Sequence, residues 1–265
     1  MSIFTCKEVY IISLKKNISD FNHILKFFPY AQIFRAIDMR NANISTLDLT
    51  LRAKLSILHG QDSSEDVCSK GAVGCSLSHY MCWKKLLLTN KPYCVIFEED
   101  VVFRKNKMKN LQQYINSSEK MGANYVSFGS EFNSLGTELL YKKYDQNANR
   151  VYMFLGSYAQ KVTRQGALTL VKNFFPIDMQ VDGYISTLCR FGYLIASAPR
   201  KKIAKVRFSL KTTVQRKTLP SIKTLVPRCN TFYTSVFFVF ISLTVLLALT
   251  CYKIKKLSRT LSTNK

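Results

Sequence analysis

The sequence predicts an α/β sandwich with a mainly parallel sheet, followed by one transmembrane helix near the C-terminus. Two observations lead to this prediction. Short apolar runs alternate with helix-like segments through the first ~200 residues, which is typical of helices packed against a parallel sheet. Further on, residues 232–252 contain no charged side chain. The chain is therefore expected to comprise a domain over 1–199, a basic linker over 200–231, the apolar helix over 232–252 and a basic tail over 253–265.

Strands and helices are expected to alternate through the N-terminal domain. Apolar runs rich in β-branched and aromatic side chains predict strands at 9–14, 32–37, 93–97, 125–128 and 151–160. Helical spacing predicts helices at 20–28, from the Gly71/Gly74 region to 88, 106–121, 164–174 and 182–191. The first of these helices would begin at Ser19 or Asp20 as its N-cap. Asn90 and Pro92 end the second.

The apolar run near the C-terminus predicts a membrane anchor. Its 21 residues would form an α-helix about 31 Å long, which matches a hydrocarbon core of roughly 30 Å. Aromatic side chains stand at both ends, as in many interfacial belts, and a soluble core helix would instead show a polar stripe. The early apolar run at 9–14 has no cleavage site and is interpreted as a strand, not a signal peptide. These features predict a tail anchor with the N-terminal domain in the cytosol.

The positive charge of the chain is concentrated near its C-terminus. The formal net charge is +23, and the segment from Gly183 to Lys265 contains 16 Lys and Arg but no Asp or Glu. A nucleic-acid binder would usually add a helix-turn-helix, an RNP-type strand or zinc-finger spacing, and the sequence has none of these. A membrane surface is therefore the expected partner of the basic linker, and nucleic acid is not. The eight cysteines form no CxxC pair, which favours a reducing compartment.

The most informative candidate site is the acidic end of the strand at 93–97. Three carboxylates, Glu98, Glu99 and Asp100, follow this apolar run directly. In open α/β sheets, ligands bind at the carboxyl ends of strands. Mg²⁺ or Mn²⁺ typically takes one or two carboxylates together with substrate phosphates. Glu98 and Asp100 therefore predict a metal site for a nucleotide diphosphate, and the alternative is a solvated acidic turn.

Three further segments strengthen this interpretation. Gly71 and Gly74 open the helix before the acidic strand, where small residues allow a helix N-terminus to approach a phosphate. Asp38 ends the second predicted strand. Asp178 precedes the helix predicted at 182–191, and Asp182 stands at its start.

Five motifs in this order resemble glycosyltransferase family 25. They are R-A-I-D at 35–38, G-x-x-G-C-x-x-S-H at 71–79, V-I-x-E-x-D-V at 95–101, R-x-G-A at 164–167 and P-I-D-x-x-V-D at 176–182. The family includes the lipooligosaccharide β-galactosyltransferases of bacteria and the collagen galactosyltransferases. Each motif alone is weak, but the five occur in the family's order over residues 7–197.

The resemblance implies a GT-A-type fold and the transfer of a hexose from a nucleotide-sugar donor, often UDP-galactose, with inversion. The acceptor would be a hydroxyl of a glycan, a lipid or a protein. Glu98 and Asp100 would hold Mn²⁺ or Mg²⁺ and the diphosphate, and Asp38 would lie near the donor nucleoside. Asp182 would be the general base, with Asp178 as the alternative, since spacing does not decide between them.

The chain departs from the family pattern in its first loop. The family's first strand usually leads into Asn-Leu and then an Arg, whereas residues 13–17 read Ser-Leu-Lys-Lys-Asn and His23 stands near the expected Arg position. Lys16 could bind the donor phosphate instead. Glu98-Glu99-Asp100 replaces the more usual Glu-Asp-Asp, and both outer carboxylates are kept. The altered loop leaves a second hypothesis open, a catalytically inactive, membrane-tethered interaction module.

His79 has three interpretations. On a helix it shares a face with Cys75, Cys82 and Trp83, at i−4, i+3 and i+4. A Cys-His-Cys zinc site would lack a fourth ligand and tetrahedral closure. His79 could otherwise be a packed, hydrogen-bonded structural residue or a contact of the donor site.

Overall fold

The structure is a computed structural model that describes residues 3–59, 66–129, 141–153 and 156–207. The chain divides into two units, 1–217 and 218–265, and all described residues belong to the first.

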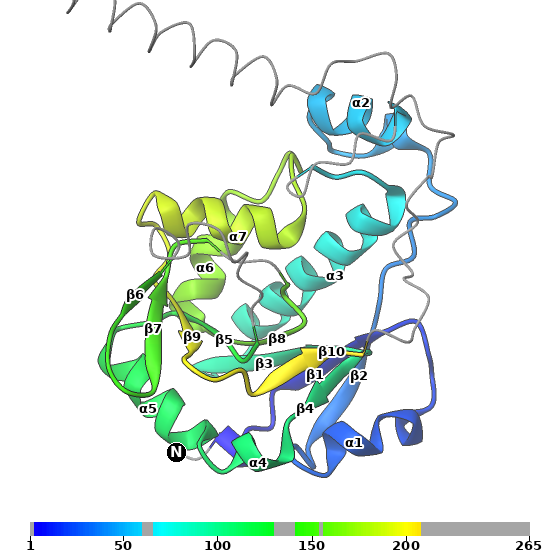
Figure 1. Cartoon of the computed structure of the whole chain (residues 1–265). Helices are drawn as coiled ribbons and strands as arrows, with labels where there is room; N and C mark the ends of the chain where they lie inside the picture. The colour runs from blue at the N-terminus through cyan, green and yellow to red at the C-terminus, as the bar shows by residue number, and fades with distance from the viewer. Residues whose placement is uncertain (1–2, 60–65, 130–140, 154–155, 208–265) are drawn as a thin grey trace, which may run out of the picture. The chain divides into compact units, whose positions relative to one another are not determined.

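An eight-stranded sheet forms the centre of the domain (Figure 1). Strands β2, β1, β3, β5, β9 and β6 run in one direction, and β8 and β7 run in the other. The strand order is β2 (Ala31–Arg35), β1 (Val9–Ser13), β3 (Tyr93–Glu98), β8 (Ala159–Thr163), β5 (Tyr125–Ser127), β9 (Ala196–Pro199), β7 (Ala148–Val151) and β6 (Tyr141–Lys143). A separate antiparallel pair joins β4 (Val101–Phe103) to β10 (Ala204–Val206).

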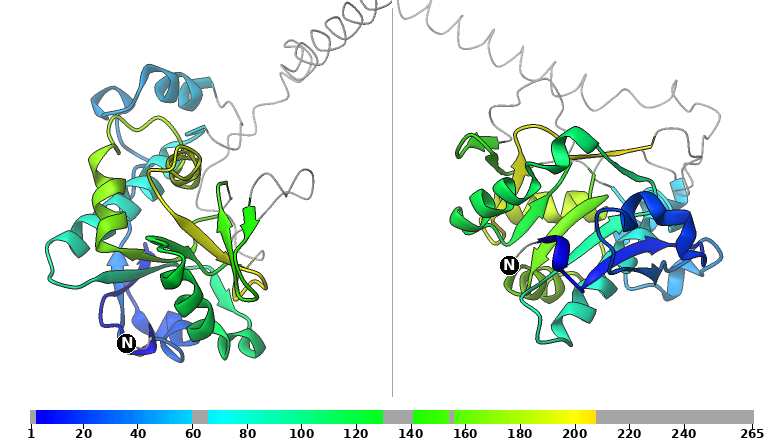
Figure 2. Two further views of the ribbon diagram at one scale, coloured as in Figure 1. Left: turned by 90° about the vertical axis from the view of Figure 1, so that its left-hand side faces the viewer. Right: turned by 90° about the horizontal axis from the view of Figure 1, so that it is seen from below.

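Helices cover both faces of the sheet (Figure 1). One face carries α3 (Lys70–Leu87), α6 (Arg164–Lys172) and α7 (Val181–Arg190), and α2 (Leu51–His59) adds to the same core. The other face carries α1 (Asn22–Leu25), α4 (Lys105–Met108) and α5 (Leu111–Lys120), and the view from below in Figure 2 looks onto it. Short 3₁₀ turns lie at Ile3–Thr5, Ile18–Phe21 and Ile44–Thr46.

The pleat of the central strands explains the two hydrophobic cores. On β3, Cys94 and Ile96 point to the core under α3, while Val95 and Phe97 point to the core over α5. All four are fully buried, as expected for a central strand whose side chains alternate between two covered faces. This alternation also decides which way the residues at the end of β3 point.

The predicted strands and helices are largely confirmed, with three corrections. The strand predicted at 151–160 joins the end of β7 to the start of β8, and Gly156 between them has a φ of 89°, incompatible with a continuous strand. The helix predicted at 106–121 is two helices, α4 and α5. The first helical segment is capped by Asn17, whose side chain accepts from Ser19 N, and not by Ser19 or Asp20.

The prediction of a membrane anchor is not retained. Across the described residues, no helix has the length and apolar character needed to cross a bilayer. The predicted span at 232–252 lies outside the described residues. The fold class is therefore corrected to a mixed α/β domain, and the C-terminal transmembrane helix, the tail anchor and the cytosolic placement of the domain are withdrawn. Residues 204–206, predicted to belong to the linker, form β10, and Arg207 N donates to Asp100 O at 2.9 Å.

Candidate active site

The three carboxylates at the end of β3 have different surroundings. Glu99 lies on the opposite side from Glu98, and its Oε2 accepts from Ser13 Oγ at 2.6 Å at the end of β1. Ser13 Oγ also accepts from Lys15 N at 2.9 Å. Glu99 therefore ties the acidic turn to the first loop and has its own protein partner.

Glu98 lies on the side of α3, where polar side chains surround it. His79 Nε2 lies 3.2 Å from Glu98 Oε1, and Ser157 Oγ donates to the same oxygen at 3.3 Å. Gln160 Nε2 lies 2.7 Å from His79 Nδ1. Both His79 and Gln160 are fully buried. Glu98 is thus held from the protein side through one of its two oxygens.

Asp100 is a partly buried carboxylate whose charge is poorly compensated. Its Oδ1 is buried and has no hydrogen-bond partner among the described residues. Burial, followed by repulsion from Glu98, raises the pKa of Asp100 to about 6. Such a carboxylate becomes fully ionised at neutral pH more readily when a cation lies beside it.

Asp182 is the second residue of helix α7 and lies in the electrostatic field of Glu98. Its Oδ2 accepts from Gly156 N at 3.0 Å and its Oδ1 from Gly183 N at 2.9 Å. Burial is the largest influence and raises the pKa of Asp182; the two amides lower it, and Glu98 raises it further. The net upward shift is suited to a residue that must accept a proton near neutral pH.

Cys75 marks the point at which these groups converge. Burial, with added repulsion from Glu98, Asp182 and Asp100, raises the pKa of the Cys75 thiol well above its ordinary value. The ligand atoms of Cys75, His79 and Glu98 all lie within 4.8 Å of one another. The structure therefore brings together three residues that the sequence singled out, Glu98, Asp100 and Asp182.

Glu98 and Asp100 fit a hard divalent cation. Both offer carboxylate oxygens, the ligand type that Mg²⁺ and Mn²⁺ prefer. The buried, unpartnered Asp100 Oδ1 is the observation that supports this fit, because a buried acceptor without a partner is costly.

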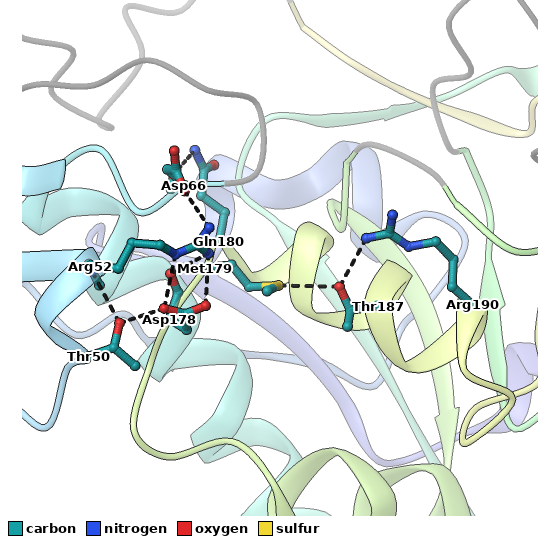
Figure 3. Close-up of polar contacts among 9 residues, drawn as sticks. Thr50, Arg52, Asp66, Asp178, Met179, Gln180, Thr187 and Arg190 are labelled. Atoms are coloured by element: carbon teal, nitrogen blue, oxygen red, sulfur yellow. Dashed lines mark hydrogen bonds and ion pairs between the residues drawn. The ribbon is translucent and has the colours of Figure 1, made fainter. Parts of the chain in front are cut away.

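Asp178 lies in a different environment from Asp182 (Figure 3). Thr50 Oγ1 donates to Asp178 Oδ1 at 2.5 Å, and Arg52 Nη2 forms an ion pair with Asp178 Oδ2 at 2.8 Å. Arg52 also pairs with Asp66 at 3.3 Å. Partial burial raises the pKa of Asp178, but the Thr50 and Arg52 contacts outweigh it and lower the pKa overall. Asp178 thus joins the segment before α7 to α2.

The donor-side candidates lie on the loops after β1 and β2. Asp38 is exposed, and the hydrogen bonds from Arg40 lower its pKa to about 2. Lys16 is exposed in the loop after β1.

The two candidate glycines lie inside α3, which begins one residue before Gly71. Ser69 is the N-cap of α3 and accepts from Ala72 N at 3.1 Å. A Cβ at Gly74 would lie 2.4 Å from Ile37 O, and Ser78 Oγ accepts from Ile37 N at 2.9 Å. The close approach at Gly74 is therefore to the backbone that leads to Asp38, a packing reason for glycine that needs no phosphate.

Sequence reasoning missed the residues that support Glu98. Gln160 and Ser157 lie within the run that was predicted to be one strand, 151–160, and the turn at Gly156 was not recognised. The available signal was a glutamine inside a run that the sequence predicts to be a strand. The Cys-His-Cys zinc set weighed for His79 is also different from the group in the structure, since Glu98 and not Cys82 completes the group with Cys75.

Most of the chain matches one known protein family. The family described as "Glycosyltransferase family 25 (LPS biosynthesis protein)" matches residues 6–214. The chain belongs to glycosyltransferase family 25, which confirms the resemblance inferred from the five motifs.

Individual relatives match shorter stretches. The chain is 32% identical over 112 residues to "Inactive glycosyltransferase 25 family member 3" of Mus musculus, covering 40% of this chain and 18% of that protein. It is 30% identical over 105 residues to "Lipooligosaccharide biosynthesis protein lic2B" of Haemophilus influenzae, covering 39% and 37%. Among solved structures, A197 from STIV is similar with a TM-score of 0.40 and 11% identity, over 79% of this chain and 97% of that one. The matches thus span well under half of these two relatives.

Proposed function

We propose that this chain is a metal-dependent glycosyltransferase that moves a hexose from a nucleotide-diphosphate sugar to an acceptor hydroxyl, with inversion at the anomeric carbon. The observation that supports it most directly is the meeting of Glu98, Asp100 and Asp182 near the carboxyl end of β3. Asp182 is electrostatically coupled to Glu98, and Glu98 to Asp100. The edge of the sheet where strands end is also the usual ligand site of α/β folds.

Glu98 and Asp100 are the proposed ligands of Mn²⁺ or Mg²⁺. When bound, the cation would offset the negative charge that develops on the departing diphosphate. The protein contributes the orientation of the two carboxylates and the burial that strengthens their field.

Asp182 is the proposed general base. The acceptor oxygen attacks the anomeric carbon and its proton passes to the Asp182 carboxylate. The bond between the anomeric carbon and the diphosphate oxygen breaks, and its electron pair leaves with the diphosphate. The amides of Gly156 and Gly183 hold both oxygens of Asp182 in place, so the base is oriented before the acceptor binds. Asp178 is the weaker candidate because Arg52 already neutralises it.

The donor nucleotide is proposed to lie along the loops after β1 and β2. These loops contain Lys16 and Asp38, and both side chains are exposed to a ligand from solvent. Gly71, in the first turn of α3, remains a candidate for phosphate approach, and Gly74 contributes by letting α3 pack against the loop of Asp38. UDP-galactose is the first donor to test.

A glycan is the first acceptor to test, because two bacterial relatives are named for lipooligosaccharide biosynthesis, lic2B and lex-1 of Haemophilus influenzae. The decisive assay incubates the full chain with a panel of nucleotide sugars and Mn²⁺, with and without oligosaccharide acceptors. We expect metal-dependent release of the nucleoside diphosphate that stops in the double variant Glu98→Ala, Asp100→Ala. Asp20→Asn, an exposed carboxylate in the turn after the first loop, is the matched control. Unchanged activity in the double variant would refute the metal assignment.

A second function is supported by one specific observation. The mouse relative that matches 112 residues of this chain is named an inactive family member. A catalytically inactive domain that binds a nucleotide sugar or a partner is therefore the alternative. Calorimetry with UDP and Mn²⁺ separates the two when it is combined with the turnover assay. Binding without turnover of any donor would favour the inactive domain.

A further inference from the structure

A buried chain of hydrogen bonds runs from the turn before β8 to the end of β3. It comprises Ser157, Gln160, His79 and Glu98, whose contacts with one another are described above. In addition, Gln160 Nε2 lies 3.2 Å from the backbone oxygen Ser157 O. Ser157, Gln160 and His79 are all buried. Buried polar side chains are usually retained for a specific pairing, so the direction of each hydrogen bond matters.

Strand pairing places Gln160 and Glu98 on the same face of the sheet. β8 runs antiparallel to β3, with Gln160 opposite Ile96, and directly opposed residues point to the same side. Glu98 is two residues beyond Ile96 and shares its face. That face is covered by α3, which brings His79 between the two side chains.

The amide of Gln160 determines which nitrogen of His79 has the hydrogen. Ser157 O can only accept, so the group 3.2 Å from it must be the NH₂ end of Gln160. Gln160 Oε1 has no partner among the described residues, and so it does not favour the opposite orientation. The second amide hydrogen then points at His79 Nδ1, which must accept. Neutral His79 therefore has its hydrogen on Nε2 and donates to Glu98 Oε1.

We propose that His79, oriented by Gln160, acts with Ser157 as a positioning residue that fixes one oxygen of Glu98 and leaves the other to the divalent cation. This inference rests on the proposed function, because it assumes that Glu98 is a metal ligand. In this tautomer Nε2 carries a hydrogen and has no free lone pair, so it would not ligate a zinc ion together with Cys75 and Glu98.

The geometry explains how His79 and Ser157 fix the carboxylate of Glu98. Two donors, His79 Nε2 and Ser157 Oγ, converge on Oε1 and restrict rotation of the carboxylate. Residues that orient metal ligands in this way typically contribute about 10- to 100-fold to metal affinity or activity. The effect of removing them should therefore appear in cation binding by itself, before any sugar is transferred.

The first experiment reads the tautomer of His79 directly. Long-range ¹H–¹⁵N spectra of the labelled full chain distinguish the two neutral tautomers of its three histidines, and His79→Gln identifies the His79 signals. We expect the Nε2–H form for His79 and a change of its signals in Gln160→Leu. A His79 with hydrogen on Nδ1 would overturn the proposal, whatever the enzymatic activity.

The second experiment measures Mn²⁺ binding to the full chain by calorimetry, without nucleotide. We expect Gln160→Leu and His79→Leu to weaken Mn²⁺ by about 10-fold or more, and His79→Gln, whose amide can still donate to Glu98, to restore most of the affinity. Ser157→Ala removes one donor with little effect on packing and should give an intermediate loss, even if His79→Leu does not fold. The matched control is His59→Gln, because His59 is exposed.

The variants separate this proposal from the proposed function. If Glu98→Ala leaves Mn²⁺ binding unchanged, the metal site itself is wrong. If Glu98→Ala abolishes binding but Gln160→Leu and Ser157→Ala do not weaken it, the metal site stands and the positioning role is wrong. If Cys75→Ser weakens Mn²⁺ as much as His79→Leu, Cys75 belongs to the ligand set and the positioning role is again overturned.

Discussion

Asp178 and Asp182 come from one short motif, yet the fold gives them opposite properties. Asp182 is half-buried, has no cationic partner among the described residues and has a raised pKa. Asp178 is partly exposed, pairs with Arg52 and has a lowered pKa. The first belongs to the cluster of Glu98, Asp100 and Asp182, and the second to the clasp of Asp178, Arg52 and Thr50. Four residues along the chain separate a candidate base from a structural carboxylate, because Asp178 lies beside Arg52 whereas Asp182 accepts from two backbone amides.

The largest expected effect separates these two aspartates by kinetics. Asp182→Asn keeps the size of the side chain, but its amide cannot take the proton from the hydroxyl of the acceptor substrate. We therefore expect kcat/KM to fall by about 10²- to 10⁴-fold. Asp178→Asn should change it much less, because Asp178 lies in the clasp. Steady-state transfer assays on both variants check this. An equal loss in Asp178→Asn would mean that the clasp is part of the catalytic site.

The second prediction uses pH to contrast the cluster with the clasp. The pKa of Asp100 is raised to about 6, so below that pH a proton must leave before Asp100 can hold a cation. We expect Mn²⁺ affinity to fall as pH drops through 6, by up to about tenfold per pH unit. Asp178 has a lowered pKa and stays ionised over this range. Calorimetric titrations between about pH 5 and 7, on either side of the pKa of Asp100, should show this dependence. The Asp100→Asn variant should remove it.

The third prediction concerns the helix that brings His79 to the cluster. Gly74→Ala would place a Cβ 2.4 Å from Ile37 O, so α3 or the loop of Asp38 must shift. We expect the free energy of unfolding to fall by about 1–3 kcal/mol, measured by denaturant unfolding. Met81→Ala on the same helix is the control, because Met81 is exposed. Equal stability of Gly74→Ala and wild type would show that the loop yields without cost.

The smallest effect concerns the clasp. Arg52 and Thr50 lower the pKa of Asp178 in the folded protein below its unfolded value of about 3.9. Their contribution to the free energy of unfolding is therefore present above that unfolded value, and it is lost as pH falls through the folded pKa. We expect Arg52→Ala to lower the free energy of unfolding at pH 7 by only about 0.2–1 kcal/mol, since the pair is partly exposed. Lys54→Ala on the same helix is the comparison. A loss that persists unchanged at pH 2, below about 3.9, would show that Arg52 acts through packing and not through Asp178.

Much of the fold could be predicted because local patterns coincide with local structure. The strand at 93–97 and the helix over 164–174 correspond closely to β3 and α6, since apolar periodicity is set by neighbours in sequence. The errors occur where a turn interrupts an apolar run, as at Gly156, or where one helical pattern contains two helices, as at α4 and α5. β9 and β10 were missed because their short strands are recognisable only through their partners.

By itself, the sequence determined the strand that ends in Glu98 and Asp100, the order of the five motifs and hence the family. These are properties of residues close together in the chain. Only the tertiary structure decided that Asp182, and not Asp178, faces these carboxylates, and that Gln160 orients His79. Both depend on contacts between segments about 20 to 130 residues apart, whose geometry is set by strand pairing and helix packing. Local pattern encodes which elements form, and packing determines which side chains meet.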